Sequence, residues 1–205
     1  MIVIIDYGVG NLGSIRNMLN KIGVEGVISS ETNIIDAASK LILPGVGAFG
    51  YGIKKLNDSG IIKTLEKKVL GEKTPILGIC LGAQLFTRRS EEGRINGLGW
   101  FDAETVKFDF GNNPQNLKIP HMGWSDVTFN PSSRLFTDMY SEPRFYFVHA
   151  YHLKTIHKQE IVATSVYGHE FCSGMERDNI VGVQFHPEKS HKFGMRILKN
   201  FVELY

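Results

Sequence analysis

The stretch "TPILGICLGAQLFTRR", residues 74–89, places a cysteine where a short apolar run changes to a helical pattern. The residues before Cys80 predict a buried strand and residues 81–89 predict a helix, so Cys80 would lie at the sharp turn between them. Gly78 and Gly82 stand two positions away on either side, and glycine permits both a tight turn and a close approach of neighbouring elements. This pattern is the thiol counterpart of the G-x-S-x-G nucleophile elbow.

The chemistry of Cys80 depends on what the rest of the chain supplies. A thiol at a helix N-terminus lies at the positive end of the helix dipole, which favours the reactive thiolate form. A free cysteine can equally be a small buried hydrophobic residue. A cysteine nucleophile needs a base, so the two readings are separated by a histidine further along the chain.

The first 90 residues alternate between strand-like and helical patterns. Such alternation indicates a mostly parallel central sheet with helices on both faces, as in flavodoxin-like α/β folds. The predicted strands cover residues 2–6, 26–29, 40–44 and 74–80, and the predicted helices cover residues 12–23, 48–56, 61–71 and 81–89.

The second half of the chain is richer in strands. Short strand-like segments with brief connections indicate antiparallel hairpins, which either continue the sheet or form a small second sheet. A helix over 191–205 would close the chain, and the polar stretch 108–118 is the best candidate for a mobile loop. We expect one domain over residues 1–205. The predicted strands here are 100–108, 125–129, 144–153, 161–167, 170–176 and 180–185.

Length, charge and cysteine content exclude several classes of protein. The 205 residues have 42% hydrophobic content and a net charge of +2, with the charges interspersed, so the electrostatic footprint of a nucleic-acid-binding protein is missing. Two cysteines, Cys80 and Cys172, are too few for a disulfide framework. The N-terminal residues do not resemble a signal peptide, and no apolar run has the length of a membrane span. We expect a soluble cytoplasmic protein.

Residues 8–13, "GVGNLG", match the dinucleotide-binding pattern G-x-G-x-x-G. They follow a predicted strand and open a predicted helix, and Glu31 lies about 20 residues further on. However, Asp6 and Tyr7 interrupt the run into the first glycine, and the other distinctive residues of the chain serve thiol chemistry. We therefore favour a glycine-permitted loop at the carboxyl edge of the sheet, where α/β folds place their sites.

The segment "VQFHPEKS", residues 183–190, supplies a base and a carboxylate. In an extended segment, residues two apart point the same way, so His186 and Glu188 would face one site. A carboxylate that holds one ring nitrogen fixes the tautomer and leaves the other nitrogen free to accept a thiol proton. Cys80, His186 and Glu188 therefore form a candidate nucleophile, base and orienting carboxylate.

An acyl-transfer site also needs donors for the oxyanion. The backbone N–H of Leu81, the residue after the nucleophile, is one natural donor. The glycine-rich segment "LPGVGAFG", residues 43–50, follows another predicted strand and offers a second. There Gly45, Val46 and Gly47 would bring main-chain N–H groups close to a bound carbonyl, and Val46 is the expected donor.

Taken together, these motifs resemble those of the class I glutamine amidotransferases, over nearly the whole chain. Two segments, "DYGVGNL" (6–12) and "PHMGW" (120–124), make it similar in particular to the HisH-like glutaminase subunits of imidazole glycerol phosphate synthase. The motifs that carry the resemblance are "LPGVGAF" (43–49), "GICLGAQ" (78–84), "PHMGW" (120–124), "FVHAY" (147–151) and "GVQFHPEKS" (182–190).

The resemblance implies that Cys80 attacks the side-chain amide of glutamine, releases ammonia and forms a γ-glutamyl thioester that water hydrolyses to glutamate. It implies proton transfer by His186 and orientation of His186 by Glu188. It implies no cofactor and no metal. The residues that would bind glutamine are Gly45, Gly47, Gln84, His149, Ala150 and Tyr151.

The resemblance also implies a heterodimer with a HisF-like (β/α)8-barrel cyclase subunit. Ammonia would pass directly into the barrel, and the products would be imidazole glycerol phosphate and AICAR, the aminoimidazole carboxamide ribonucleotide. The loop at Gly45–Gly47 would have to rearrange first, so the site would be nearly idle until the substrate of the partner is bound. The residues that would face the partner are Asn11, Met122, Trp124, Tyr146 and Lys189.

Several departures from the pattern leave other functions open. Ser125 stands where an asparagine is common, and His152 stands where an aromatic residue is common. The segment "FCSGME" (171–176) lacks the usual pattern of small residues, and several of these departures lie near the partner side. A HisH paralogue that supplies ammonia for surface-sugar biosynthesis is therefore an alternative. A stand-alone thiol hydrolase would not need the "PHMGW" and "YGVGNL" segments. A non-catalytic regulatory module would not need the intact cysteine, histidine and glutamate.

Overall fold

The computed structural model describes residues 1–111 and 117–205, so the middle of the loop expected over 108–118 lies outside the described residues. Five parallel strands form one half of the main sheet, in the order β2-β1-β3-β4-β14. Their residues are almost entirely buried because helices cover both faces of this half. The strands are β1 (Ile2–Ile5), β2 (Gly26–Ser29), β3 (Lys40–Gly45), β4 (Ile76–Cys80) and β14 (Ile180–Val183).

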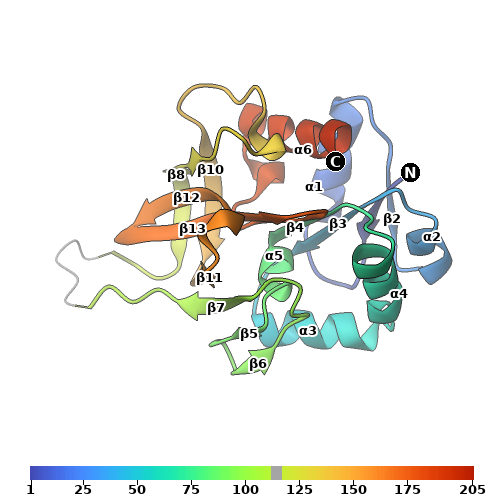
Figure 1. The fold of residues 1–205 in the computed structure, drawn as a ribbon, viewed down its shortest axis with the longest axis horizontal. Helices are drawn as coiled ribbons and strands as arrows, with labels where there is room; N and C mark the ends of the chain where they lie inside the picture. The colour runs from blue at the N-terminus through green and yellow to red at the C-terminus, as the bar shows by residue number, and fades with distance from the viewer. Residues whose placement is uncertain (112–116) are drawn as a thin grey trace.

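Alternate residues of the parallel strands feed two hydrophobic cores, one on each face of the sheet. Val3 and Ile5 belong to the core beneath α2 to α5, whereas Ile2 and Ile4 belong to the core beneath α1 and α6. Figure 1 shows these two helical layers on opposite sides of the sheet. The helices are α1 (Leu12–Lys21), α2 (Thr32–Asp36), α3 (Phe49–Asp58), α4 (Ile62–Glu66), α5 (Leu81–Leu85) and α6 (His191–Leu204).

The second half of the chain both extends the main sheet and builds a second one. Beyond β14 the sheet continues through β13, β11, β7, β5 and β6, with β12 and β9 branching from β13. Strands β8 (His121–Asp126) and β10 (Arg144–His149) pair only with each other, as an antiparallel ribbon. The others are β5 (Arg89–Ser90), β6 (Ile95–Asn96), β7 (Ala103–Lys107), β9 (Thr128–Phe129), β11 (Tyr151–Thr155), β12 (Ile161–Tyr167) and β13 (His169–Arg177).

The mostly parallel α/β fold is confirmed, but several element boundaries were wrong. The strand expected over 144–153 is two strands that separate at Ala150, because β10 pairs with β8 whereas β11 pairs with β7. The final strand-like segment, 180–185, is expected in the antiparallel half. β14 does pair antiparallel with β13, but it is parallel to its other neighbour, β4. The short helix α2 was not predicted, and the helix expected over 61–71 changes to a π-helical turn at Lys67.

The helix expected over 81–89 was too long, because α5 ends at Leu85. The carbonyl groups at its end are taken by a returning segment of chain: Leu98 N–H donates to the Leu85 carbonyl at 2.8 Å and Phe101 N–H donates to the Phe86 carbonyl at 2.9 Å. The Thr87 hydroxyl donates to the Gln84 carbonyl at 2.8 Å. These bonds replace the next helical turn, and Arg89 begins β5 instead.

Glycine at positions 78 and 82 is required by the close packing of α5 on the sheet. A Cβ added to Gly82 would lie 1.9 Å from the Leu43 carbonyl oxygen, and one added to Gly78 would lie 2.8 Å from the backbone of Ala83. The Cβ at Gly78 would also lie 2.5 Å from the Phe86 ring, but the Leu43 and Ala83 obstacles are main-chain atoms, which cannot turn aside as a flexible side chain would. Backbone therefore meets backbone at the point where the chain turns at Cys80.

We expect Gly82→Ala to lower the free energy of unfolding by about 3 kcal/mol, the upper end of what overpacking costs. Denaturant unfolding followed by circular dichroism measures this change. Gly71→Ala is the matched control, because a Cβ there meets nothing within 4 Å, and its effect should stay within about 0.5 kcal/mol. Equal stability of the two variants would contradict the packing argument.

Candidate active site

Cys80 occupies a strained backbone position at the end of β4. It has φ +52° and ψ −110°, a conformation that L-residues rarely adopt, and it directly precedes α5. Its side chain is 5% exposed and lines a cavity of about 510 Å³. The elbow predicted from the two flanking glycines is therefore present, with the strain on the cysteine itself.

His186 and Glu188 lie beside Cys80 as a buried pair. His186 Nδ1 lies 2.8 Å from Glu188 Oε1, and both side chains are at most 2% exposed. His186 lines the same cavity as Cys80. Burial lowers the pKa of His186, but the negative charge of Cys80 and then the contact with Glu188 outweigh burial and raise the pKa to about 10. The structure thus brings together the three residues predicted as nucleophile, base and orienting carboxylate.

The two-residue period of an extended strand, from which this pairing of His186 and Glu188 was predicted, does not hold over both residues. His186 itself has an extended backbone, but Pro187–Lys189 forms a 3-10 turn, so Glu188 does not continue a strand. The turn folds Glu188 back toward the imidazole ring. His186 Nε2, the nitrogen away from Glu188, has no hydrogen-bond partner among the described residues, so it is the ring position that can exchange a proton at the cavity.

The segment that carries His186 is tied to β10. His186 N–H donates to the Tyr146 carbonyl at 2.9 Å. The Ser190 hydroxyl donates to the His186 carbonyl at 2.6 Å and accepts from the Tyr146 N–H at 3.0 Å. The position of His186 is thereby coupled directly to the backbone of Tyr146.

The glycine-rich loop expected to supply an oxyanion donor lies next to Cys80. Gly45, at the end of β3, is the register partner of Cys80, and Val46 and Gly47 line the cavity together with Leu81. Gly47 has φ +92°, a conformation that favours glycine. The buried Tyr7 hydroxyl, a feature that the sequence did not reveal, donates to the Pro44 carbonyl at 2.8 Å and anchors the start of this loop.

The residues predicted to bind glutamine also meet at the cavity. Gln84, His149, Ala150 and Tyr151 line it, whereas Gly45 lies just behind the lining. Gln84 Nε2 donates to the Tyr151 carbonyl at 2.9 Å and to Gln184 Oε1 at 3.1 Å. Gln84 therefore has a structural role as well, because its amide links two segments of the cavity wall.

Sequence reasoning missed two polar residues of the site. Glu92 lines the cavity, and its Oε2 accepts from the Phe49 N–H at 2.7 Å. No recognisable motif surrounds it. Gln184 is fully buried, and its Nε2 lies 3.7 Å from the Cys80 sulfur. The two-residue spacing used for His186 and Glu188 applies equally to Gln184 and His186, and would have indicated it.

Of the residues predicted to face a partner, Met122 and Trp124 lie in β8 and Tyr146 lies in β10. Met122 and Trp124 are 62% and 45% exposed, and the Trp124 ring meets the Tyr146 ring edge-on at 6.2 Å. Lys189 Nζ lies 5.4 Å from the centre of the Tyr146 ring and also lines the cavity. Asn11 directly precedes α1, which packs against the turn that holds Lys189.

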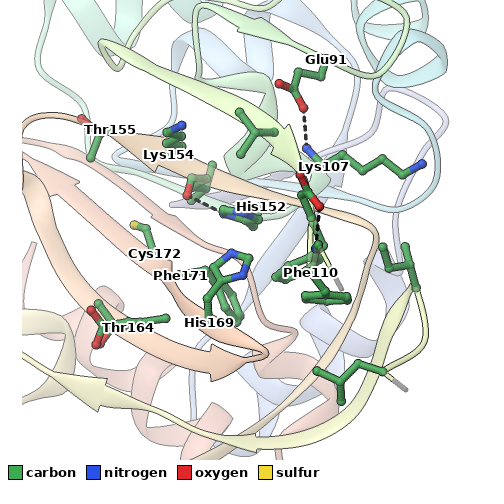
Figure 2. A pocket seen from close by; sticks show the side chains of 18 of the residues that line it. Glu91, Lys107, Phe110, His152, Lys154, Thr155, Thr164, His169, Phe171 and Cys172 are labelled. Carbon is green, nitrogen blue, oxygen red and sulfur yellow. Dashed lines mark hydrogen bonds between the residues drawn. The ribbon is translucent and has the colours of Figure 1, made fainter. Parts of the chain in front are cut away.

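A second cavity, of about 1340 Å³, shares no lining residue with the first. Figure 2 shows His152 and His169 next to each other among its lining residues, together with Cys172. The two imidazole rings meet edge-on, with ring centres 5.5 Å apart. Burial raises the pKa of Cys172 to about 12, so this thiol stays protonated at neutral pH. Within residues 1–111 and 117–205, no cluster of His, Cys, Asp and Glu could hold a metal ion, and no helix is long and apolar enough to cross a membrane.

The family model for class I glutamine amidotransferases matches residues 3–204. The chain belongs to this family. It is therefore a glutamine amidotransferase, as the resemblance of its motifs indicated. Two solved structures share the fold. One is a glutamine amidotransferase with a TM-score of 0.75 at 18% identity, covering 100% of this chain and 98% of that one. The other is PurLQS from Thermotoga maritima, with a TM-score of 0.72 at 18% identity, covering 98% of this chain and 96% of that one.

Relatives with high sequence identity place the chain among the HisH proteins of this family. It is 52% identical over 203 residues to "Imidazole glycerol phosphate synthase subunit HisH 2" of Methanococcus maripaludis, covering 99% of each chain. It is 45% identical over 204 residues to the subunit of the same name from Pseudomonas aeruginosa, covering 100% of each chain.

We expect the two cysteines of this glutamine amidotransferase to differ sharply in reactivity. Iodoacetamide at pH 7.5 should alkylate Cys80, which opens into a cavity beside a base, and should leave Cys172 unmodified because its thiol is protonated and buried. Mass spectrometry of tryptic peptides measures both sites. Full unfolding before alkylation is the control, and it should label both. Preferential labelling of Cys172 in the folded protein would contradict the assignment.

Proposed function

We propose that the chain hydrolyses glutamine to glutamate and ammonia, with Cys80 as the nucleophile. The observation that carries this proposal is the buried arrangement of Cys80, His186 and Glu188 at one cavity. Glu188 holds Nδ1 of the imidazole ring and leaves Nε2 directed to the reacting atoms. Cysteine and histidine perform acyl transfer together with an asparagine in papain-like proteases, and serine and histidine do so together with a carboxylate in α/β-hydrolases.

The chemical steps follow from this geometry. The Cys80 thiol gives its proton to His186 Nε2, and the sulfur attacks the side-chain carbonyl carbon of glutamine. His186 then returns the proton to the leaving nitrogen, so ammonia departs and a γ-glutamyl thioester remains. His186 next takes a proton from water, the hydroxide attacks the thioester, and glutamate leaves as the proton returns to sulfur.

Backbone and side-chain groups at the cavity suit the substrate. The N–H groups of Val46 and Leu81 would stabilise the oxyanion of each tetrahedral intermediate, and Gly47 permits the loop to turn one of them inward. The Glu92 carboxylate lies on the same cavity and suits the α-ammonium group of a free amino acid. Gln84 and the segment from His149 to Tyr151 would hold the rest of the glutamine.

We further propose that the chain is the HisH subunit of a cytoplasmic imidazole glycerol phosphate synthase in histidine biosynthesis. The relatives carry that name, and a subunit implies a partner. A HisF-like (β/α)8-barrel would cover Asn11, Met122, Trp124, Tyr146 and Lys189. It would receive the ammonia and make imidazole glycerol phosphate and AICAR. Ser125, where asparagine is common, is the observation that keeps a paralogue for surface-sugar biosynthesis as the second candidate.

Replacement of the nucleophile should separate the two halves of the reaction. In the complex with the barrel, Cys80→Ser should abolish glutamine-dependent synthesis, a loss of at least about 10³-fold, and should leave synthesis from added ammonium unchanged. Product formation with each nitrogen source measures this. Retention of glutamine hydrolysis by the variant would disprove the assignment of Cys80, and equal loss with ammonium would disprove the division of labour.

Glutamine hydrolysis should also depend on the partner. The chain alone should be nearly inactive, because a misdirected oxyanion donor costs roughly 10²–10³-fold, and activity should rise with the barrel and rise again with its nucleotide substrate. Trp124→Ala should blunt this activation, whereas Tyr51→Ala, an equally exposed aromatic residue on α3, should not. Glutamate release measures all three states. Full activity of the isolated chain would contradict the proposal.

A further inference from the structure

A chain of hydrogen bonds runs through the protein from β8 to the sulfur of Cys80, and the Tyr151 carbonyl stands at its centre. This oxygen accepts from Gln84 Nε2 at 2.9 Å and lies 2.8 Å from His149 Nδ1. A carbonyl oxygen can only accept hydrogen bonds. Gln84 Nε2 and His149 Nδ1 must therefore both be donors. This sets the direction of the hydrogen bonds that continue from Gln84 toward Cys80 and from His149 toward β8.

On the side of β8, the direction follows from the chemistry of neutral imidazole. His149 Nδ1 carries the proton, so His149 Nε2 is an acceptor. His121 Nδ1, 3.1 Å away, must donate to it, which leaves His121 Nε2 as an acceptor in turn. The Ser125 hydroxyl, 2.8 Å from His121 Nε2, must then be the donor. Gly123 between them has φ +134°, a conformation that favours glycine in this strand.

On the side of Cys80, the direction follows from the two amides. Gln84 presents its nitrogen to the Tyr151 carbonyl, and the same nitrogen donates to Gln184 Oε1 at 3.1 Å. With its oxygen committed to Gln84, Gln184 must turn its nitrogen the other way. Gln184 Nε2 lies 3.7 Å from the Cys80 sulfur. An N–H group therefore points at the thiol, and it cannot be exchanged for an oxygen without breaking the bond to Gln84.

Burial keeps this arrangement intact. His121, His149, Gln84 and Gln184 are each at most 6% exposed. Burial lowers the pKa of His121 to about 4 and that of His149 to about 3, so both rings are neutral at pH 7. A neutral ring has one donor and one acceptor, which the chain requires, whereas a protonated ring would set two donors against each other.

We propose that Gln184 is a further catalytic residue, whose Nε2–H group donates a hydrogen bond to the Cys80 thiolate, and that Gln84, fixed by the Tyr151 carbonyl, holds it in this orientation. This inference rests on the proposed role of Cys80 as nucleophile. When the thiol proton moves to His186 Nε2, the negative charge on sulfur gains a charge-assisted hydrogen bond. When the thioester forms, that charge is gone and the bond weakens, so Gln184 favours the attacking form of the enzyme.

The first test measures the thiol without any glutamine. Gln184→Met keeps the shape of the side chain but removes the N–H donor, and it should slow the alkylation of Cys80 by iodoacetamide at pH 7 roughly tenfold, as expected for the loss of one hydrogen bond to a charged group. The matched control is Asn200→Leu, which removes another buried amide, bonded to the Leu135 and Thr137 carbonyls. This control should lose stability but keep the wild-type alkylation rate.

The outcomes of this test are distinct from a failure of the proposed function. If Gln184→Met is folded and alkylates at the wild-type rate, while glutamine hydrolysis still requires Cys80, the role of Gln184 is wrong and the nucleophile stands. Equal slowing in Asn200→Leu would also overturn the role of Gln184, because the effect would then be general loosening of the fold. Glutamine hydrolysis by Cys80→Ser would overturn the proposed function itself.

The second test uses the wild-type chain and needs no variant to fold. Nitrogen-15 NMR distinguishes the two neutral tautomers of histidine, and we expect both His121 and His149 to carry the proton on Nδ1, the less common form in free histidine. Ser125→Ala should allow the Nε2–H form of His121 to appear, whereas Ser125→Thr, which keeps the hydroxyl, should not. An Nε2–H tautomer of His149 in the wild-type protein would mean that Nδ1 does not donate to the Tyr151 carbonyl, and it would overturn the geometry at this carbonyl from which the orientation of Gln84 and Gln184 is derived.

Discussion

The site depends on one steric constraint, the contact of the α5 backbone with the β3 backbone. A side chain at Gly82 would meet the Leu43 carbonyl oxygen at 1.9 Å, so only glycine lets the chain turn there. That contact holds Cys80 at φ +52° and places it opposite Gly45 in the register of β3 and β4. The candidate nucleophile and the loop expected to serve the oxyanion thus derive their spacing from the sheet itself.

Strand β14 brings His186, the candidate base, to the edge of the sheet at which Cys80 lies. It arrives from the far end of the sequence and pairs with β4, so the segment after Val183 leaves the sheet beside Cys80. Three neighbouring parallel strands, β3, β4 and β14, therefore end at one place, the edge where α/β sheets hold their ligands. The burial of His186 and Glu188 then favours a tight pair, because an unpartnered charge in this position would be costly.

Much of this could be predicted from the sequence, because apolar runs and glycines act locally. The strands 26–29 and 161–167 and the elbow at Cys80 were all placed correctly. The length of α5 could not be predicted, since it ends where residues 97–101 return to take its carbonyl groups. The parallel pairing of β14 was missed for a similar reason, because strand direction is set by partners far away in the chain.

The candidate site divides in the same way. Cys80 and His186 belong to motifs that a short segment carries, whereas Glu92 and the Tyr7 hydroxyl gain their positions only from tertiary packing. Gln184 lies between these cases. Its spacing from His186 was visible in the sequence, but its partner Gln84 is 100 positions away, so its bond could not be inferred.

The β8–β10 ribbon connects the protein surface to the candidate site, because one of its faces is exposed and the other contributes hydrogen bonds to the interior. Met122 and Trp124 project outward, whereas His121 and Ser125 point inward and begin the hydrogen bonds that end at Cys80. Tyr146 adds a second connection, through Ser190 to the backbone of His186. A partner bound to the outer face would therefore contact a ribbon whose backbone is hydrogen-bonded directly to the segment that carries His186.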